Sequence, residues 1–298
     1  MPLFRTAEDW PRRPEALPAV SLLGRVLLGD PAEFDVVEAI NVHMADADGR
    51  LQRIDRGLAR RQWQELRAAY ERIGVPVEVL PARPGLVDLC FTANPSLVLP
   101  LPDGGREAWL ARMAHPSRQP EVALHEEFLA AAGIPLRRMP ETVGRFEGCG
   151  DGLVHPGRHL LHAGVGPRTA EAAWQALAEA HPELDILVYE LQDERFYHLD
   201  TALAPLSETC ALYVREAFDR DGLELLQAAF PEAIAVPLHE ALRFACNAHC
   251  PDGRHVLIER GCARAASEMR RRGFEPIELE TSEFRKSGGS VFCLKLAF

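Results

Sequence analysis

The chain has 298 residues, of which 47% are hydrophobic, so it is long enough for one large domain or two ordinary ones with a sizeable core. It carries 44 acidic and 33 basic residues, which give a formal net charge of −11. This balance argues against a broad surface for nucleic acid or anionic membrane, because both need clustered Lys and Arg. A small cationic substrate is compatible with it.

The chain contains seven cysteines, an odd number scattered along a sequence that does not need disulfide bonds to fold. This usage predicts a reducing compartment, the cytoplasm. Residues 16–25 are apolar but include a proline and end at an arginine, so they make a poor signal peptide and no transmembrane helix. We expect one domain over residues 1–298, with residues 1–25 as a candidate for a loosely ordered N-terminal extension.

The predicted elements repeat one order along the chain, a helix, a break and a short strand. Within residues 61–73, apolar side chains recur at helical spacing, at Trp63, Leu66, Tyr70 and Ile73. Gly74 ends this helix, and residues 75–80 predict a strand. The same order returns with helices at 122–132, 169–181, 223–230 and 262–272 and with strands at 134–136, 186–189, 234–236 and 277–279.

Further extended segments lie between these helices, at 97–99, 160–162 and 211–213. The units recur every ~40 to 60 residues, a spacing at which repeated supersecondary structure should be suspected. The pattern predicts an α/β chain of quasi-repeats without an obvious linker.

Three distant segments carry residues that are typical of a cysteine-dependent active site. Cys293 follows a glycine pair and is expected at the close of a terminal strand. The other two segments are Phe-Glu-Gly-Cys-Gly-Asp (146–151) and Phe-Tyr-His-Leu-Asp-Thr (196–201). Together they supply a thiol, an imidazole and several carboxylates.

Four motifs in order give the chain a family resemblance: Phe-Thr-Ala-Asn-Pro (91–95), Glu-Gly-x-Gly-Asp (147–151), His-Leu-Asp-Thr (198–201) and Gly-Gly-x-x-x-Cys (288–293). The chain resembles the guanidino-group-modifying enzymes of the pentein superfamily, from residue 34 to the C-terminus. These include dimethylarginine dimethylaminohydrolase, arginine deiminase, arginine dihydrolase and the amidinotransferases. The resemblance implies a five-fold pseudosymmetric α/β-propeller of ββαβ-like units around a central channel that holds a small cationic guanidino substrate, with no cofactor and no metal.

The resemblance also assigns catalytic roles. Cys293 would be the nucleophile, which attacks as a thiolate, although cysteines often simply fill a core. His198 would be the general acid and base, because its ordinary pKa lies near neutrality. Asp200 lies two positions on, so in a strand both side chains would face one side and hold a guanidinium beside His198. Glu147 would orient the histidine or pair with the substrate, whereas Asp151 is expected to be structural.

Other residues are expected to bind the substrate. Arg118 and Arg168 each follow a turn and open a helix, and the resemblance implies that they hold the substrate α-carboxylate, for which a forked cation is suited. Asp88 resembles a substrate-binding acid, with a surface charge as the alternative. Cys246, His249 and Cys250 are a conceivable metal cluster, but a fourth ligand is missing.

Asn94 is the position that discriminates most between substrates. Deiminases of the family carry aspartate there, whereas arginine dihydrolases resemble this chain. An asparagine both accepts and donates hydrogen bonds, so its carbonyl could hold a guanidinium N–H and its amide the urea oxygen of a citrulline-like product. The alternative is a turn before Pro95.

We therefore expect a cysteine-dependent hydrolase that cleaves C–N bonds of arginine or N-methylated arginine through a covalent thiouronium. Citrulline would form after one cycle, and ornithine plus ammonia after two. An amidinotransferase is the second enzymatic alternative. A non-catalytic binding module is the third, because the fold also occurs in a ribosome-binding initiation factor. An oligomer is compatible with the sequence.

Overall fold

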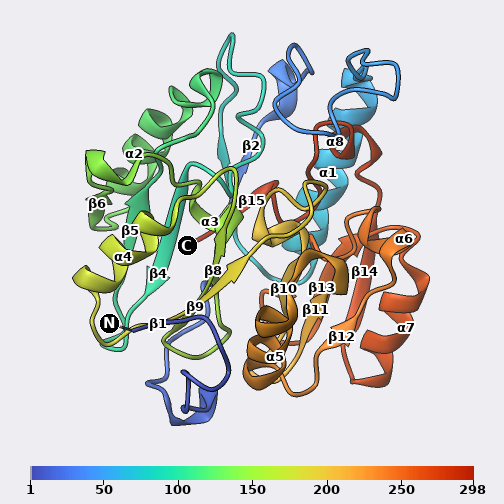
Figure 1. The fold of residues 1–298 in the computed structure, drawn as a ribbon. Coiled ribbons are helices and arrows are strands. Elements are labelled where there is room, and N and C mark those ends of the chain that lie inside the picture. Colours follow the sequence, from blue (N-terminus) through green and yellow to red (C-terminus); the bar gives the residue numbers. More distant parts are fainter. Residues whose placement is uncertain (1) are drawn as a thin grey trace.

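The computed structural model describes residues 2–298, and its strands form five separate sheets. Figure 1 shows these sheets around the middle of the molecule, where the C-terminus lies, with the longer helices toward the outside. The predicted α/β fold of five units is confirmed.

The first three units are built from elements that follow one another along the chain. The first contains β2 (Val26–Gly29), α1 (Arg56–Arg72) and β3 (Val77–Leu80). The second contains β4 (Ser96–Pro100), β5 (Arg106–Leu110), α2 (Glu121–Ala131) and β6 (Leu136–Arg138). The third contains β7 (Gly152–Val154), β8 (Leu160–Val165), α4 (Glu171–Ala180) and β9 (Asp185–Glu190).

The last two units complete the set. The fourth contains β10 (Leu203–Pro205), β11 (Ala211–Tyr213), α5 (Arg220–Ala229) and β12 (Ile234–Ala235). The fifth contains β13 (His255–Glu259), α7 (Ala263–Arg271) and β14 (Glu275–Leu279). Short helices lie between or after the units: α3 (Gly148–Asp151), α6 (Leu238–Ala241) and α8 (Ser282–Arg285).

One pairing rule holds in all units. The strand before the long helix is parallel to the strand after it, as a helical crossover requires. In four units, a further strand pairs in antiparallel fashion with the strand that precedes the long helix. In the first unit this strand is β15 (Lys295–Ala297), which pairs with β2 and so joins the two ends of the chain. The pairing fixes the position of Cys293, which lies two residues before β15.

Helix α1 illustrates how the local sequence sets an element. Trp63, Leu66 and Tyr70 are buried and pack against the first sheet, as their spacing predicts. The helix begins earlier than the predicted residue 61, because the Asp55 carboxylate accepts the N–H of Leu58 and caps it. Apolar periodicity from Trp63 onward does not mark this start, which depends on the Asp55 cap.

The N-terminal segment packs against the third unit. β1 (Leu3–Phe4) pairs with β9, and Trp10 is buried with its indole N–H donated to Asp185 Oδ2 at 2.8 Å. Within residues 2–298, no helix combines the length and the apolarity needed to cross a lipid bilayer.

Candidate active site

A small cavity collects side chains from distant parts of the chain. Of the predicted site residues, five line it: Asp88, Asn94, Arg118, Arg168 and Cys293. The other three, Glu147, His198 and Asp200, are each at most 1% exposed, and they contact Arg168, Tyr197 and Cys293 of this lining, respectively. The structure thus gathers all the predicted site residues in one place.

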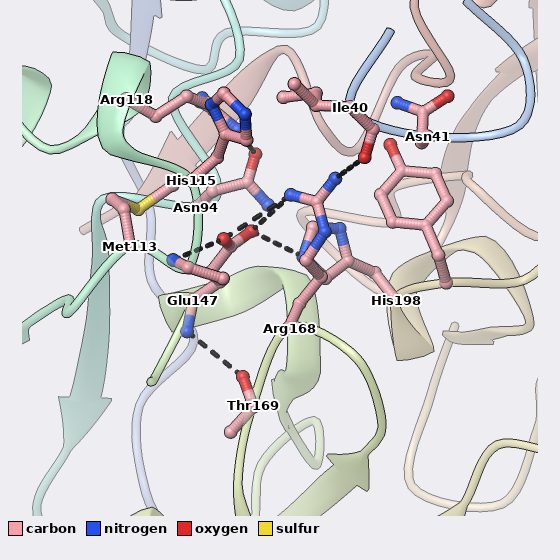
Figure 2. A network of polar contacts seen from close by, with 12 residues as sticks. Ile40, Asn41, Asn94, Met113, His115, Arg118, Glu147, Arg168, Thr169 and His198 are labelled. Carbon is pink, nitrogen blue, oxygen red and sulfur yellow. Dashed lines mark hydrogen bonds and ion pairs between the residues drawn. The ribbon is translucent and has the colours of Figure 1, made fainter. Parts of the chain in front are cut away.

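Glu147 lies at the centre of a polar network (Figure 2). Its Oε2 atom is 2.8 Å from His198 Nε2 and accepts a hydrogen bond from Arg168 Nη1 at 3.1 Å. Burial opposes ionisation, but the hydrogen bond and charge of His198, followed by Arg168, outweigh it and lower the pKa of Glu147 to about 2. Because the carboxylate holds Nε2, the other ring nitrogen of His198 is the one left for chemistry.

Two glycines allow the Glu147 turn to approach the site. A side chain at Gly148 would lie 2.3 Å from the Ser96 carbonyl oxygen, and one at Gly150 would lie 2.5 Å from Asn94 Nδ2. Gly148 also has a φ of +48°, which favours glycine. The Gly-Cys-Gly sequence is therefore required by close packing of α3 against the Asn94 loop and His198.

Cys293 is 2% exposed, and two side chains form hydrogen bonds with its sulfur. The thiol donates to Asp200 Oδ2 at 3.1 Å, and Asn247 Nδ2 donates to the sulfur at 3.1 Å. Burial and then the Asp200 carboxylate raise the pKa of the Cys293 thiol well above its ordinary value. Near neutral pH the unliganded thiol is therefore mainly protonated, and a cation nearby would favour its ionisation.

Two expectations about local structure are wrong. Cys293 lies in a turn before β15 and not at the close of a strand, because its backbone N–H is taken by the Asn247 side chain. Residues 198–200 do not form a strand, since His198 precedes a 3₁₀ turn at Leu199–Thr201. That turn is held by Asp151 Oδ1, which accepts the N–H of Leu199 at 3.0 Å. Consequently His198 contacts Glu147, while Asp200 contacts Cys293.

Arg118 is 4% exposed and already has protein partners. Its guanidinium donates to Glu121 Oε2 at 2.8 Å and to Asn94 Oδ1 at 2.9 Å, and it also reaches the carbonyl oxygens of Asp88 and Phe91. Arg118 thus takes one of the two acceptor positions of the Asn94 carbonyl oxygen, which the sequence assigned to a guanidinium N–H of the substrate. Asn94 Nδ2 is buried and has no partner among the described residues.

Arg168 connects the network to the loop that carries Ile40. Its Nη2 atom donates to the Ile40 carbonyl oxygen at 2.5 Å, and its guanidinium carbon lies 5.1 Å from the centre of the Tyr197 ring. Asp88, on another wall, accepts the Ser287 hydroxyl at 3.3 Å, and burial raises its pKa despite the nearby Arg118. Both positive and negative groups thus line the cavity.

Sequence reasoning missed several residues at the site. Tyr197 lines the cavity and donates its hydroxyl to the Gly288 carbonyl oxygen at 2.8 Å. Its position next to His198 was the available signal. Asn247 was missed because it lies within the segment that was interpreted as a conceivable metal cluster. In the structure, His249 of that segment forms a hydrogen bond through Nδ1 with the Tyr70 hydroxyl at 2.8 Å. Over residues 2–298, no group of three His, Cys, Asp or Glu side chains is arranged to hold a metal ion.

A second, larger cavity has a mainly apolar lining that includes Lys295 and Phe292. Lys295 is 2% exposed, and its ammonium lies 3.2 Å from the centre of the Phe292 ring. Burial lowers the pKa of Lys295 to about 8. Cys293, two residues earlier, lines the smaller cavity instead, so the smaller cavity is the candidate active site.

Comparison with known proteins places these features in a family. No protein-family model matches the chain. The chain is 36% identical over 272 residues to an N(G),N(G)-dimethylarginine dimethylaminohydrolase of Mycobacterium tuberculosis, covering 91% of this chain and 85% of that protein. It is 32% identical over 274 residues to the bifunctional arginine dihydrolase/ornithine cyclodeaminase AgrE of a Nostoc species, covering 91% of this chain but 37% of that protein.

A solved structure points to the same group of enzymes. The N-terminal domain of ArgZ, a cyanobacterial arginine dihydrolase crystallised with its substrate, superimposes with a TM-score of 0.84 at 30% identity. The match covers 91% of this chain and 97% of that domain. The chain therefore belongs to the guanidino-group-modifying superfamily of the pentein fold, together with the dimethylarginine dimethylaminohydrolases and the arginine dihydrolases.

Proposed function

We propose that this protein is a cysteine-dependent hydrolase of the guanidinium group of arginine or an N-methylated arginine. One observation carries the proposal: among the predicted site residues, three buried polar atoms lack a partner within residues 2–298. They are Asp200 Oδ1, His198 Nδ1 and Asn94 Nδ2. Buried polar atoms are normally hydrogen-bonded, so such a set is expected to bind a polar ligand. The named relatives support a guanidino compound as that ligand.

The charges of the site favour a cation next to the sulfur. Burial raises the pKa of Asp200 to about 6, so near neutrality its carboxylate is largely ionised but poorly compensated. A guanidinium that donates to Asp200 Oδ1 would compensate this charge. The same cation would lower the pKa of the Cys293 thiol, because an adjacent positive charge favours the thiolate. Substrate binding would thus activate its own nucleophile.

The reaction then proceeds in two halves. The Cys293 thiolate attacks the central guanidinium carbon, and His198 protonates the departing ammonia or alkylamine, which leaves a thiouronium on the sulfur. His198 next deprotonates a water molecule that attacks the same carbon and releases citrulline. Glu147 keeps the imidazole oriented through both steps and stabilises its protonated form.

Asn94 supports a second cycle. Since Arg118 occupies the Asn94 carbonyl oxygen, the free side of the amide is a donor. A donor there would hold the urea oxygen of bound citrulline for a second cycle, in which attack by Cys293 on the urea carbon expels the second ammonia, and hydrolysis followed by breakdown of the resulting carbamate gives ornithine and carbon dioxide. Arg118 and Arg168 would draw the substrate α-carboxylate mainly through their charge, since carboxylates and backbone carbonyls already accept several of their N–H groups.

The cellular compartment follows from the same chemistry. All seven cysteines are free thiols, and the mechanism needs Cys293 in its reduced form. We therefore place the protein in the reducing cytoplasm.

One experiment tests the function. The purified protein is incubated separately with arginine, asymmetric dimethylarginine and agmatine, and the products are identified by mass spectrometry. We expect arginine or dimethylarginine to be consumed, and agmatine to react poorly because it lacks the carboxylate that the two arginines would attract. Absence of turnover with all three compounds would overturn the proposal.

A further inference from the structure

We propose that Asn247 is a further catalytic residue, which fixes the Cys293 loop and donates a hydrogen bond to the sulfur so that the thiolate forms more readily. This inference rests on the proposed function for its role in turnover. Its central claim, that the Asn247 amide stabilises the thiolate, concerns the protein without substrate.

The Asn247 side chain is 0% exposed and uses its full hydrogen-bonding capacity on the nucleophile and its neighbours. Its Oδ1 atom accepts the backbone N–H groups of Ser290 at 3.0 Å and Cys293 at 3.2 Å. Its Nδ2 atom donates to the Cys293 sulfur at 3.1 Å and to the Asp200 carbonyl oxygen at 3.0 Å. An amide with two donors and two acceptor lone pairs is the side chain that meets this demand.

The backbone around Asn247 is held as firmly as its side chain. The Asn247 carbonyl oxygen accepts the N–H of Phe292 at 3.0 Å, and its own N–H donates to the Phe244 carbonyl oxygen at 3.0 Å. Among residues 2–298, Phe244 is the one non-glycine residue with a positive φ, at +66°. A bulky residue in this conformation is strained, and such strain persists where the surrounding structure imposes it. The turn therefore holds Asn247 against residues 290–293.

The chemistry of the sulfur explains what this contact does. When the thiol loses its proton, the amide N–H keeps donating to a sulfur that now carries a full negative charge, and a hydrogen bond to an ion is stronger than one to a neutral atom. The contact thus lowers the pKa of Cys293, in opposition to burial and to the Asp200 carboxylate, which raise it. The second bond of Asn247 Nδ2, to the Asp200 carbonyl oxygen, holds Asp200 in a fixed position relative to the Cys293 sulfur.

The test measures the thiolate directly. Alkylation of Cys293 by iodoacetamide is followed by peptide mass across a pH range in the wild-type protein, Asn247→Asp and Asn247→Ala. Both variants lose the N–H donor to sulfur, and the aspartate also adds negative charge. We expect the alkylation rate at pH 8 to fall by about tenfold or more, because each unit of pKa changes the thiolate fraction tenfold below the pKa. The loss should be larger for Asn247→Asp, which keeps the shape of the side chain.

Ser290→Ala is the matched control. It removes the hydroxyl contact between Ser290 and Thr281 in the same loop without touching the sulfur, so its alkylation profile should stay like that of the wild type. If Asn247 only braces the loop, all three variants would lose thermal stability while the pH dependence of alkylation stays unchanged, and the proposal fails. Alkylation needs no substrate, so a failure of arginine hydrolysis cannot be confused with this result.

A measurement on the unmodified chain covers the case in which the variants do not fold. The chain has only three asparagines, Asn41, Asn94 and Asn247, so labelling asparagine with ¹⁵N gives three side-chain amide signals. The Asn247 signal should move when Cys293 titrates or is alkylated. A signal that stays fixed through both changes would contradict the contact.

Discussion

Arg118 Nη1 donates a hydrogen bond to Asn94 Oδ1 at 2.9 Å, and this bond determines which side of the Asn94 amide faces the cavity. An arginine can only donate, so the carbonyl side of Asn94 must face it. The N–H side is then directed away from Arg118, and within residues 2–298 it has no partner. The pair thus presents a hydrogen-bond donor to the site, which an aspartate at the same position could not do.

The first prediction concerns the product. Acting on arginine, the wild-type enzyme should release two ammonia molecules per ornithine, whereas Asn94→Asp should stop mainly at citrulline. A carboxylate has no donor for the urea oxygen of citrulline and places negative charge beside it, so the neutral product leaves before a second attack. The ratio of citrulline to ornithine, measured by mass spectrometry, reports the change.

Asn41→Asp is the control for this ratio, because Asn41 also lines the cavity and undergoes the same chemical change. It should alter the rate of turnover but not the identity of the product. A wild-type enzyme that stops at citrulline would reject the dihydrolase reading and leave a deiminase or dimethylargininase.

Periodicity and motif order predicted much of this fold from the sequence. The five helices and the strands after them follow from apolar spacing interrupted by glycine or proline, because burial against a sheet requires that spacing. The gathering of Cys293, His198 and Glu147 followed from motifs that the family shares. The helices, the strands and the catalytic residues are each marked by short stretches of sequence or by family motifs, so they could be predicted without a structure.

Contacts between distant polar groups were not predictable. Asn247 bonds to Cys293 across 46 positions, and Arg118 reaches Asn94 across 24, and no local pattern records such partners. The strand expected around His198 failed for the same reason. A carboxylate 48 positions away, on Asp151, holds the Leu199 N–H and favours a 3₁₀ turn.

The second prediction concerns the nucleophile. Cys293→Ser should reduce turnover by more than about 10³-fold while the protein stays folded, since a hydroxyl is a far weaker nucleophile than a thiolate and removal of a covalent nucleophile costs at least this much. The measurement is the rate of arginine consumption, together with circular dichroism. Cys262→Ser makes the same change at a buried thiol in the fifth unit and should keep full activity. Comparable activity in both variants would remove Cys293 from the mechanism.

The third prediction concerns Glu147→Gln. The substitution removes the charge that orients His198 and pairs with Arg168, so we expect kcat to fall by about 10² to 10⁴-fold. Stability should fall by about 3 to 5 kcal/mol near neutral pH, because Arg168 loses its buried partner. Denaturant unfolding and steady-state kinetics give the two values.

The pH dependence of stability provides a check on Glu147. Its folded-state pKa, about 2, lies below its ordinary 4.5, so its stabilisation is present above pH 4.5 and is lost as the pH falls toward 2. The wild type should lose this contribution in that window, and Glu147→Gln should not. Parallel acid unfolding curves for the two proteins would contradict the assignment.

The last prediction separates stability from activity at Asp200. Its pKa is raised from 3.8 to about 6, so its contribution to stability is greatest below pH 3.8 and is lost as the pH rises through 6. At pH 8 the buried carboxylate destabilises the fold by about 3 kcal/mol at most, by the energy that a pKa shift represents. Asp200→Asn, of the same shape but neutral, should therefore be more stable than the wild type at pH 8, and this advantage should vanish near pH 4.

The same variant should carry a more reactive thiol in an inactive enzyme. Loss of the Asp200 carboxylate removes a group that raises the pKa of Cys293, so alkylation at pH 8 should become faster. Turnover should nevertheless collapse, because the guanidinium loses the negative charge that holds it next to the sulfur. Urea unfolding at pH 4 and pH 8, iodoacetamide kinetics and arginine consumption test the three claims. An Asp200→Asn protein that keeps wild-type turnover would show that the guanidinium is held by another group, and Asp88, whose carboxylate lies in the cavity lining, would be the next to examine.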